Sequence, residues 1–303
     1  MGETIRYEMA SEDDPYVREV ALFGGVAVQS SRPSDEDVVA VLRDGVERVV
    51  AQCMGIDLSW TTSAIVSSDD LHSETSGTGR QGIDWEFALG RGEPLESVTL
   101  MATATAMEGY HWHPKWLPVV VDAHLPHGRG AGSGLVVGLS MHRWAMYDGG
   151  ADLVRAAGFL EPWLLEAAER LGADTGFVTL DRVSANDVES PWERATGIGP
   201  SARDVTRTLW SYGWGTLLAP VHVEAVGGRA ALEALGGTVD GVQVRDVGGR
   251  TWVTLGPDPG AVRPEDVRAL REVLQPALPR GPCSLEEFQR EVSPGVAPEE
   301  FVL

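Results

Sequence analysis

Histidines gather in one stretch of the 303-residue chain, between Tyr110 and Gly130. His111 and His113 form a His-x-His pair, and two such residues on a strand would place both imidazoles on the same face, as a metal site requires. His124 could return beside them from the next strand. This constellation would suit a metal-dependent hydrolase.

The same stretch has a competing, structural interpretation. Trp112, Pro114 and Trp116 lie among these histidines and are typical of a packed aromatic corner. Metal hydrolases usually add a carboxylate in a tighter signature, and histidines at polar turns need only water. We therefore keep the metal site as an alternative hypothesis and expect no cofactor.

Other catalytic patterns are weaker still. The glycine-rich stretch from Gly128 to Gly134 lacks the Gly-Lys-Ser/Thr ending of a phosphate loop, and a strand pattern follows it instead of a helix. The chain has no Gly-x-Ser-x-Gly elbow, and Cys53 ends an apolar helical pattern with no histidine nearby in sequence. The sequence therefore favours a protein without catalysis of its own.

The charge balance points toward a particular kind of partner. The chain has 45 acidic and 24 basic residues, which gives a formal net charge of −21. Such a surface repels phosphate backbones and anionic lipids, so we expect neither nucleic-acid nor membrane binding. The same field would speed encounter with a basic protein. Solubility alone is the alternative explanation for the acidity.

Targeting features are missing from the sequence. The polar, acidic stretch from Met1 to Pro15 has no basic and apolar regions of a signal peptide, and no apolar run approaches the ~18 residues of a membrane span. Two cysteines, Cys53 and Cys283, cannot form a disulfide framework. We therefore expect a cytoplasmic protein.

Hydrophobic periodicity predicts the elements that must position these residues. Strand patterns cover 17–28, 58–67, 83–89, 97–107, 117–125, 134–144 and 175–183, and a hairpin is predicted for 242–247 and 250–255 across Gly248-Gly249. Helical patterns cover 35–53, 152–171 and 264–274, with two short stretches inside 205–235. The polar stretch 68–81 is predicted as a loop.

This order of elements predicts an α+β fold with a mixed, largely antiparallel sheet flanked by helices. Both halves share the order strand, helix, hairpin-like strands and final helix, which suggests a duplicated β-α-β-β-α plan with an enlarged first copy. We expect a flexible segment over 1–16, a strand-rich half over 17–171, a second half over 172–280 packed on the first, and a proline-rich tail over 281–303.

One region resembles a known group of proteins. Its motif residues, which run from a Ser-Pro-Trp-Glu step to a proline-started helix and a Leu-Gly-Gly step, include Trp192, Trp210, Tyr212, Gly213, Trp214, Gly215 and Pro220. In its C-terminal half the chain resembles bacterial proteins of unknown function classed as immunity proteins of type VI secretion or polymorphic toxin systems. The alternative is that the aromatic residues of the motif merely fill a core.

The resemblance implies an immunity-type protein that binds and neutralises a cognate toxin, and the acidity suits a basic toxin as the partner. Two predicted contact regions follow from charge and aromatic content: acids in the 68–81 stretch and an aromatic corner, comprising Asp69, Asp70, Glu74, Tyr110, Trp112 and Trp116. A metal-dependent hydrolase and a structural or regulatory oligomer remain as alternatives, and the oligomeric state stays open.

Overall fold

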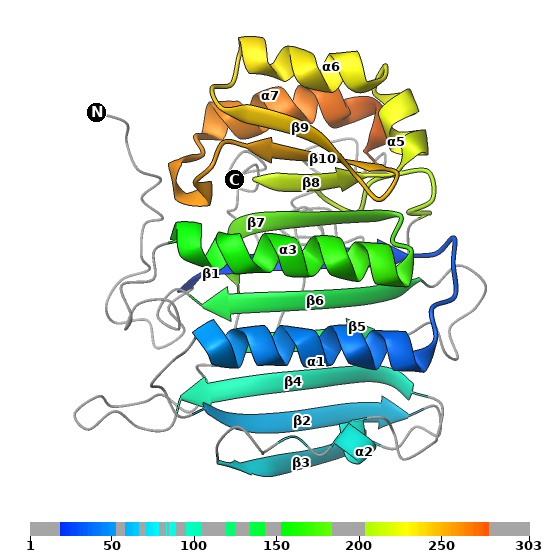
Figure 1. Cartoon of the computed structure of the whole chain (residues 1–303), viewed down its shortest axis with the longest axis vertical. Helices are drawn as coiled ribbons and strands as arrows, with labels where there is room; N and C mark the ends of the chain where they lie inside the picture. Colours follow the sequence, from blue (N-terminus) through cyan, green and yellow to red (C-terminus); the bar gives the residue numbers. More distant parts are fainter. Residues whose placement is uncertain are drawn as a thin grey trace, which may run out of the picture.

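The protein is built on one antiparallel sheet. The computed structural model describes residues 19–52, 58–66, 71–78, 83, 85–88, 95–104, 119–124, 134–142, 153–183 and 204–278. The ten strands lie in the order β3-β2-β4-β5-β6-β1-β7-β8-β10-β9, and all nine pairings within this part of the chain are antiparallel (Figure 1). The predicted α+β class is therefore confirmed.

The strands are β1 (Glu19–Val28), β2 (Leu58–Val66), β3 (Leu71–Thr78), β4 (Leu95–Ala104), β5 (Val119–His124), β6 (Leu135–His142), β7 (Thr175–Val183), β8 (Gly215–Leu218), β9 (Val242–Val247) and β10 (Arg250–Leu255). The helices are α1 (Asp35–Gln52), α2 (Trp85–Ala88), α3 (Leu153–Leu171), α5 (Pro220–Ala225), α6 (Arg229–Glu233) and α7 (Pro264–Leu274). Three short 3-10 turns, η4 (Ala234–Gly237), η5 (Pro259–Ala261) and η6 (Gln275–Ala277), complete the described elements.

The main core lies between the sheet and the helices α1 and α3, which cross one face of it side by side (Figure 1). Alternate residues of β1, namely Leu22, Val26 and Val28, point into this core. Gly24 takes the intervening position because Leu160 of α3 fills the space where a Cβ would lie, with its side chain 3.2 Å away. Each fully buried Leu or Val contributes roughly 1.5–3 kcal/mol of transfer free energy.

A smaller core covers the opposite face of the sheet. Phe23 on β1 and Phe177 on β7 pack against Trp210, with ring centroids 6.2 and 4.8 Å from the indole. Both contacts are edge-on, the geometry that aromatic pairs favour. The segment that carries Trp210, just before β8, therefore packs against β1 and β7 on the face of the sheet opposite α1 and α3.

Two predicted elements differ from the structure. The loop prediction for 68–81 is wrong at its centre, because Leu71–Thr78 pairs with β2 and places Glu74 opposite Thr62. Its serines and threonines are compatible with an extended backbone. The strand is held by backbone pairing with β2, which the pattern of side chains does not indicate. The strand prediction for 83–89 is also wrong, since Trp85–Ala88 forms α2, whose Trp85 ring lies 5.0 Å from the Arg43 guanidinium.

The repeated plan is visible in the element order. The series β1, α1, β5, β6, α3 matches β8, α5, β9, β10, α7, and in each copy the first strand pairs with the last. Strands β2, β3 and β4 enlarge the first copy. The predicted hairpin between β9 and β10 turns at Gly248 and Gly249, whose φ angles of 55° and 77° explain the two glycines.

Candidate functional site

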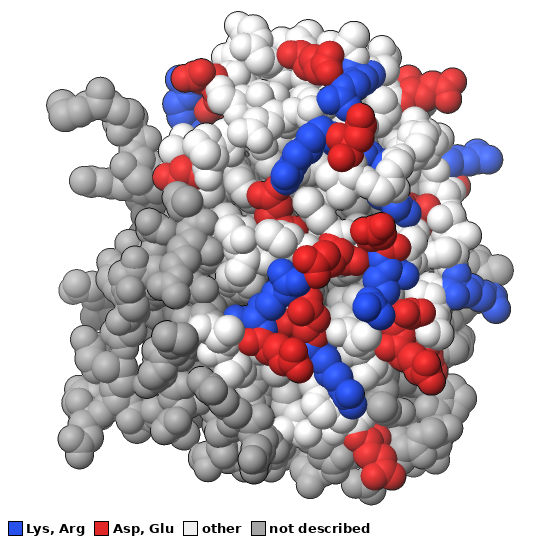
Figure 2. Space-filling view, in the orientation of Figure 1, with Lys and Arg blue, Asp and Glu red and all other residues white. Residues whose placement is uncertain are grey.

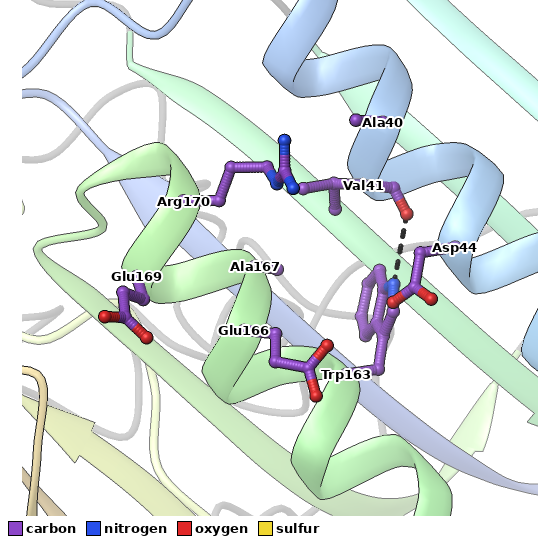
Figure 3. A pocket seen from close by; sticks show the side chains of 8 residues that line it. All are labelled: Ala40, Val41, Asp44, Trp163, Glu166, Ala167, Glu169 and Arg170. Carbon is purple, nitrogen blue, oxygen red and sulfur yellow. Dashed lines mark hydrogen bonds between the residues drawn. The ribbon is translucent and has the colours of Figure 1, made fainter.

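A groove of about 500 Å³ runs between α1 and α3 on the helix-covered face (Figure 3). Helix α1 contributes Ala40, Val41 and Asp44, and α3 contributes Trp163, Glu166, Ala167, Glu169 and Arg170. The groove therefore has a small apolar floor and charged walls. Both helices were expected from their apolar periodicity, and they lie side by side in opposite directions on the sheet, with the groove between them.

The floor of the groove is held rigidly. Trp163 is fully buried, and its Nε1–H donates to the Val41 carbonyl oxygen at 3.1 Å, as Figure 3 shows. The two helices approach closely here because residue 45 of α1 is a glycine: a Cβ at Gly45 would lie 3.1 Å from Trp163 Nε1 and 3.3 Å from Val121. The floor thus presents carbon atoms and no free indole donor.

The walls carry ion pairs that connect the helices. Arg48 Nε donates to Asp44 Oδ2 at 2.9 Å, and Arg48 Nη2 donates to Glu166 Oε2 at 2.5 Å. Arg170 reaches from α3 to Asp37 of α1 at 3.5 Å. The Arg48 side chain is 25% exposed and the Glu166 side chain 61% exposed, so water screens these pairs. Each contributes about 0.2–1 kcal/mol.

The first turn of α1 stabilises its acidic end. Ser34 caps the helix, since its Oγ accepts from Asp37 N–H at 3.1 Å and donates to Asp37 Oδ2 at 2.7 Å. The hydrogen bond from Ser34 holds the pKa of Asp37 below its ordinary value, and the positive charge of Arg170 adds to this effect. Asp37 is therefore charged at neutral pH beside the groove.

The charges of the helix-covered face alternate in sign. Figure 2 shows arginines interleaved with acidic residues over α1, α3 and the strands beyond them. The ion pairs account for this pattern, since Arg48, Arg170, Arg229 and Arg245 each contact at least one carboxylate. Glu169 differs, because it has no ion-pair partner within the described ranges. In the part of this face that the structure describes, the negative charge of the chain does not form one uninterrupted patch.

A second cavity of about 340 Å³ lies beside the end of β10. Two of its three acids are engaged: Asp258 accepts from Gly260 N–H at 2.8 Å, and Asp266 pairs with Arg263 at 2.6 Å. The Arg263 hydrogen bond holds the pKa of Asp266 below its ordinary value. These contacts fix the start of α7. We therefore assign Asp258 and Asp266 a structural role.

The residues of the resemblance motif are placed in the interior. Trp210, Tyr212 and Trp214 are all buried, and Trp214 Nε1–H donates to the Gly256 carbonyl at 2.8 Å. The two glycines have steric reasons. A Cβ at residue 213 would lie 2.6 Å from the Val178 carbonyl oxygen, and a Cβ at residue 215 would lie 2.3 Å from the Trp252 ring. Pro220 starts α5 at the surface, and Trp192 lies outside the described residues.

Most of the predicted contact and metal residues lie outside the described residues. These are Asp69, Asp70, Tyr110, Trp112, Trp116, His111 and His113, and the predicted segments 1–16 and 281–303 also fall there. Of the remaining two, Glu74 is a backbone position of β3, and His124 ends β5 opposite Ser97 and Val136. Across the described ranges, no three His, Cys, Asp or Glu residues form a group that could hold a metal ion. The contact regions and the metal site stay predictions.

Sequence reasoning missed a buried histidine. His222 is fully buried in the first turn of α5, where its Nδ1 accepts from Ala219 N–H at 3.2 Å. Its Nε2 has no hydrogen-bond partner within the described residues. Burial lowers the pKa of His222 to about 4, against the opposing charge of Asp174. The imidazole is therefore neutral at pH 7 and caps a helix; its position two residues after Pro220 was the available signal.

Asp174 anchors the same corner of the sheet. Its Oδ2 accepts from Gln29 N–H at 2.6 Å and from Ser30 N–H at 2.8 Å, so the buried carboxylate fixes the end of β1 to the start of β7. Gln29 in turn accepts from Val205 N–H at 2.8 Å. These polar groups hold strands and loops together, which is the usual reason for a buried carboxylate with several backbone donors.

Comparisons with known proteins define the class of the fold. No family model matches the chain, and no curated protein matches its sequence. Among solved structures, the fold is similar to one described as Pseudomonas aeruginosa T6SS protein PA0821. The TM-score is 0.56 at 14% sequence identity, and the alignment covers 94% of this chain and 85% of the other. At this identity the likeness establishes a shared α+β fold. None of the helices in the described ranges is long and apolar enough to cross a membrane.

Proposed function

We propose that this protein is a cytoplasmic immunity-type protein that binds and neutralises a cognate toxin of a type VI or related secretion system. The observation that carries the proposal is the fold shared with a type VI secretion (T6SS) protein over 94% of the chain. The resemblance of the Trp210 to Pro220 motif to immunity proteins comes independently from the sequence.

Charge supports the same function. A net charge of −21 favours rapid encounter with a basic protein, and toxins that act on nucleic acids are commonly basic because they must neutralise phosphates. Two of the buried polar groups, His222 and Asp174, serve as structural anchors. The exposed surface, and not a buried reaction centre, is therefore where we expect function.

Co-expression tests the proposal directly. The products of the genes beside this one are expressed in Escherichia coli singly and together with this protein. We expect one neighbour to stop growth alone, to be harmless in the presence of this protein, and to co-purify with it as a stable complex. The matched control is the same toxic neighbour expressed with an unrelated acidic protein of similar charge. A toxic neighbour that this protein neither binds nor neutralises would contradict the proposal, as would the absence of any toxic neighbour.

A further inference from the structure

We draw no further inference here: the strongest candidate, the buried side-chain cluster of His222 in the first turn of α5 and Asp174 just before β7, consists of the structural anchors already described, and a pH-sensitive role for the His222 Nε2, which has no hydrogen-bond partner within the described residues, would rest on its lowered pKa alone.

Discussion

Glycine has opposite consequences at two positions of the helices that form the groove. Replacing an interior helical glycine by alanine normally stabilises by about 0.5–1 kcal/mol. Gly158 of α3 is exposed, and a Cβ added there would have nothing within 4 Å, so it should follow this rule. A methyl group at Gly45 would press on Trp163, Val121 and Leu139 at 3.1–3.4 Å inside a packed core.

We therefore predict that Gly158→Ala raises the free energy of unfolding by about 0.5–1 kcal/mol and that Gly45→Ala lowers it by about 1 kcal/mol. Urea denaturation followed by circular dichroism measures both. The two variants make the same chemical change in helix interiors, so each is the control for the other. A stabilising Gly45→Ala would mean that Trp163 shifts freely and that the groove floor is less rigid than its hydrogen bond to Val41 indicates.

His222 makes the stability of the protein depend on pH. Its pKa is about 4 in the folded state, against 6.5 in the unfolded chain, so between these values the unfolded state binds more protons. The contribution of the neutral imidazole is fully present above pH 6.5 and is lost as the pH falls toward 4. Over this window we expect a loss of about 3 kcal/mol, from 1.36 kcal/mol per pKa unit.

The comparison variant for this prediction is His222→Asn, whose side-chain oxygen can still accept from Ala219 N–H but does not titrate. Guanidinium denaturation at several pH values should give a steeper fall in stability for the wild-type protein than for His222→Asn. The carboxylates of the chain are common to both proteins, so the difference between the two pH profiles reports on residue 222. Parallel pH profiles would show that His222 is solvated in the folded state.

At the scale of elements, Glu161 joins α3 to the second part of the sheet. Its carboxylate accepts from Trp252 Nε1–H of β10 at 3.0 Å and pairs with Arg245 of β9. The Glu161 side chain is 18% exposed, so its interactions are less screened than those of the groove walls. One side chain therefore connects three elements.

This arrangement predicts a graded response. Glu161→Gln keeps an acceptor for the buried Trp252 donor and loses the charge opposite Arg245, which should cost about 0.5–1 kcal/mol; Glu161→Ala leaves the indole donor unpaired and should cost about 1–3 kcal/mol. Thermal unfolding followed by tryptophan fluorescence gives both values. If Gln and Ala variants are equally stable, the hydrogen bond from Trp252 contributes nothing measurable.

The elements with strong periodicity were predictable from the sequence. The helix over 35–53, the helix over 152–171 and the hairpin at Gly248-Gly249 match α1, α3 and β9–β10 because apolar spacing and turn glycines are local signals. Strand β3 was not predictable in this way. Its residues are mostly polar, and they form an edge strand because β2 provides a neighbour with which to pair. The short helix α2 lies in a segment with a strand pattern, because a helix of four residues is too short to show a helical period.

The candidate site was predictable only in part. The sequence identified both helices that line the groove, but the contact of Arg48 with Glu166 joins residues 118 positions apart and depends on where the sheet places the helices. For His222 the local sequence indicates only a place in the first turn of a helix that begins at Pro220, whereas its full burial depends on the fold. Long-range contacts of this kind require the fold before the residues can be recognised.

For the whole molecule, the net charge of −21 makes a kinetic prediction. If the acidity serves a basic partner, the association rate constant should fall at least about tenfold between about 0.05 M and about 0.5 M NaCl, with little change in dissociation. Stopped-flow fluorescence with the co-purified partner measures both constants. An association rate constant that does not depend on salt would show that the acidity serves solubility. The control is a neutral osmolyte at matched viscosity.

The central place of β1 has a consequence for biosynthesis. This strand pairs with β6 on one side and with β7 on the other, yet β6 begins only at Leu135 and β7 only at Thr175. At roughly 5–20 residues per second, a ribosome takes on the order of 10 s to deliver the first neighbour. During that interval the nascent strand exposes hydrogen-bonding groups on both edges, so chaperone protection during translation should matter more for this chain than for one whose first strands form a hairpin.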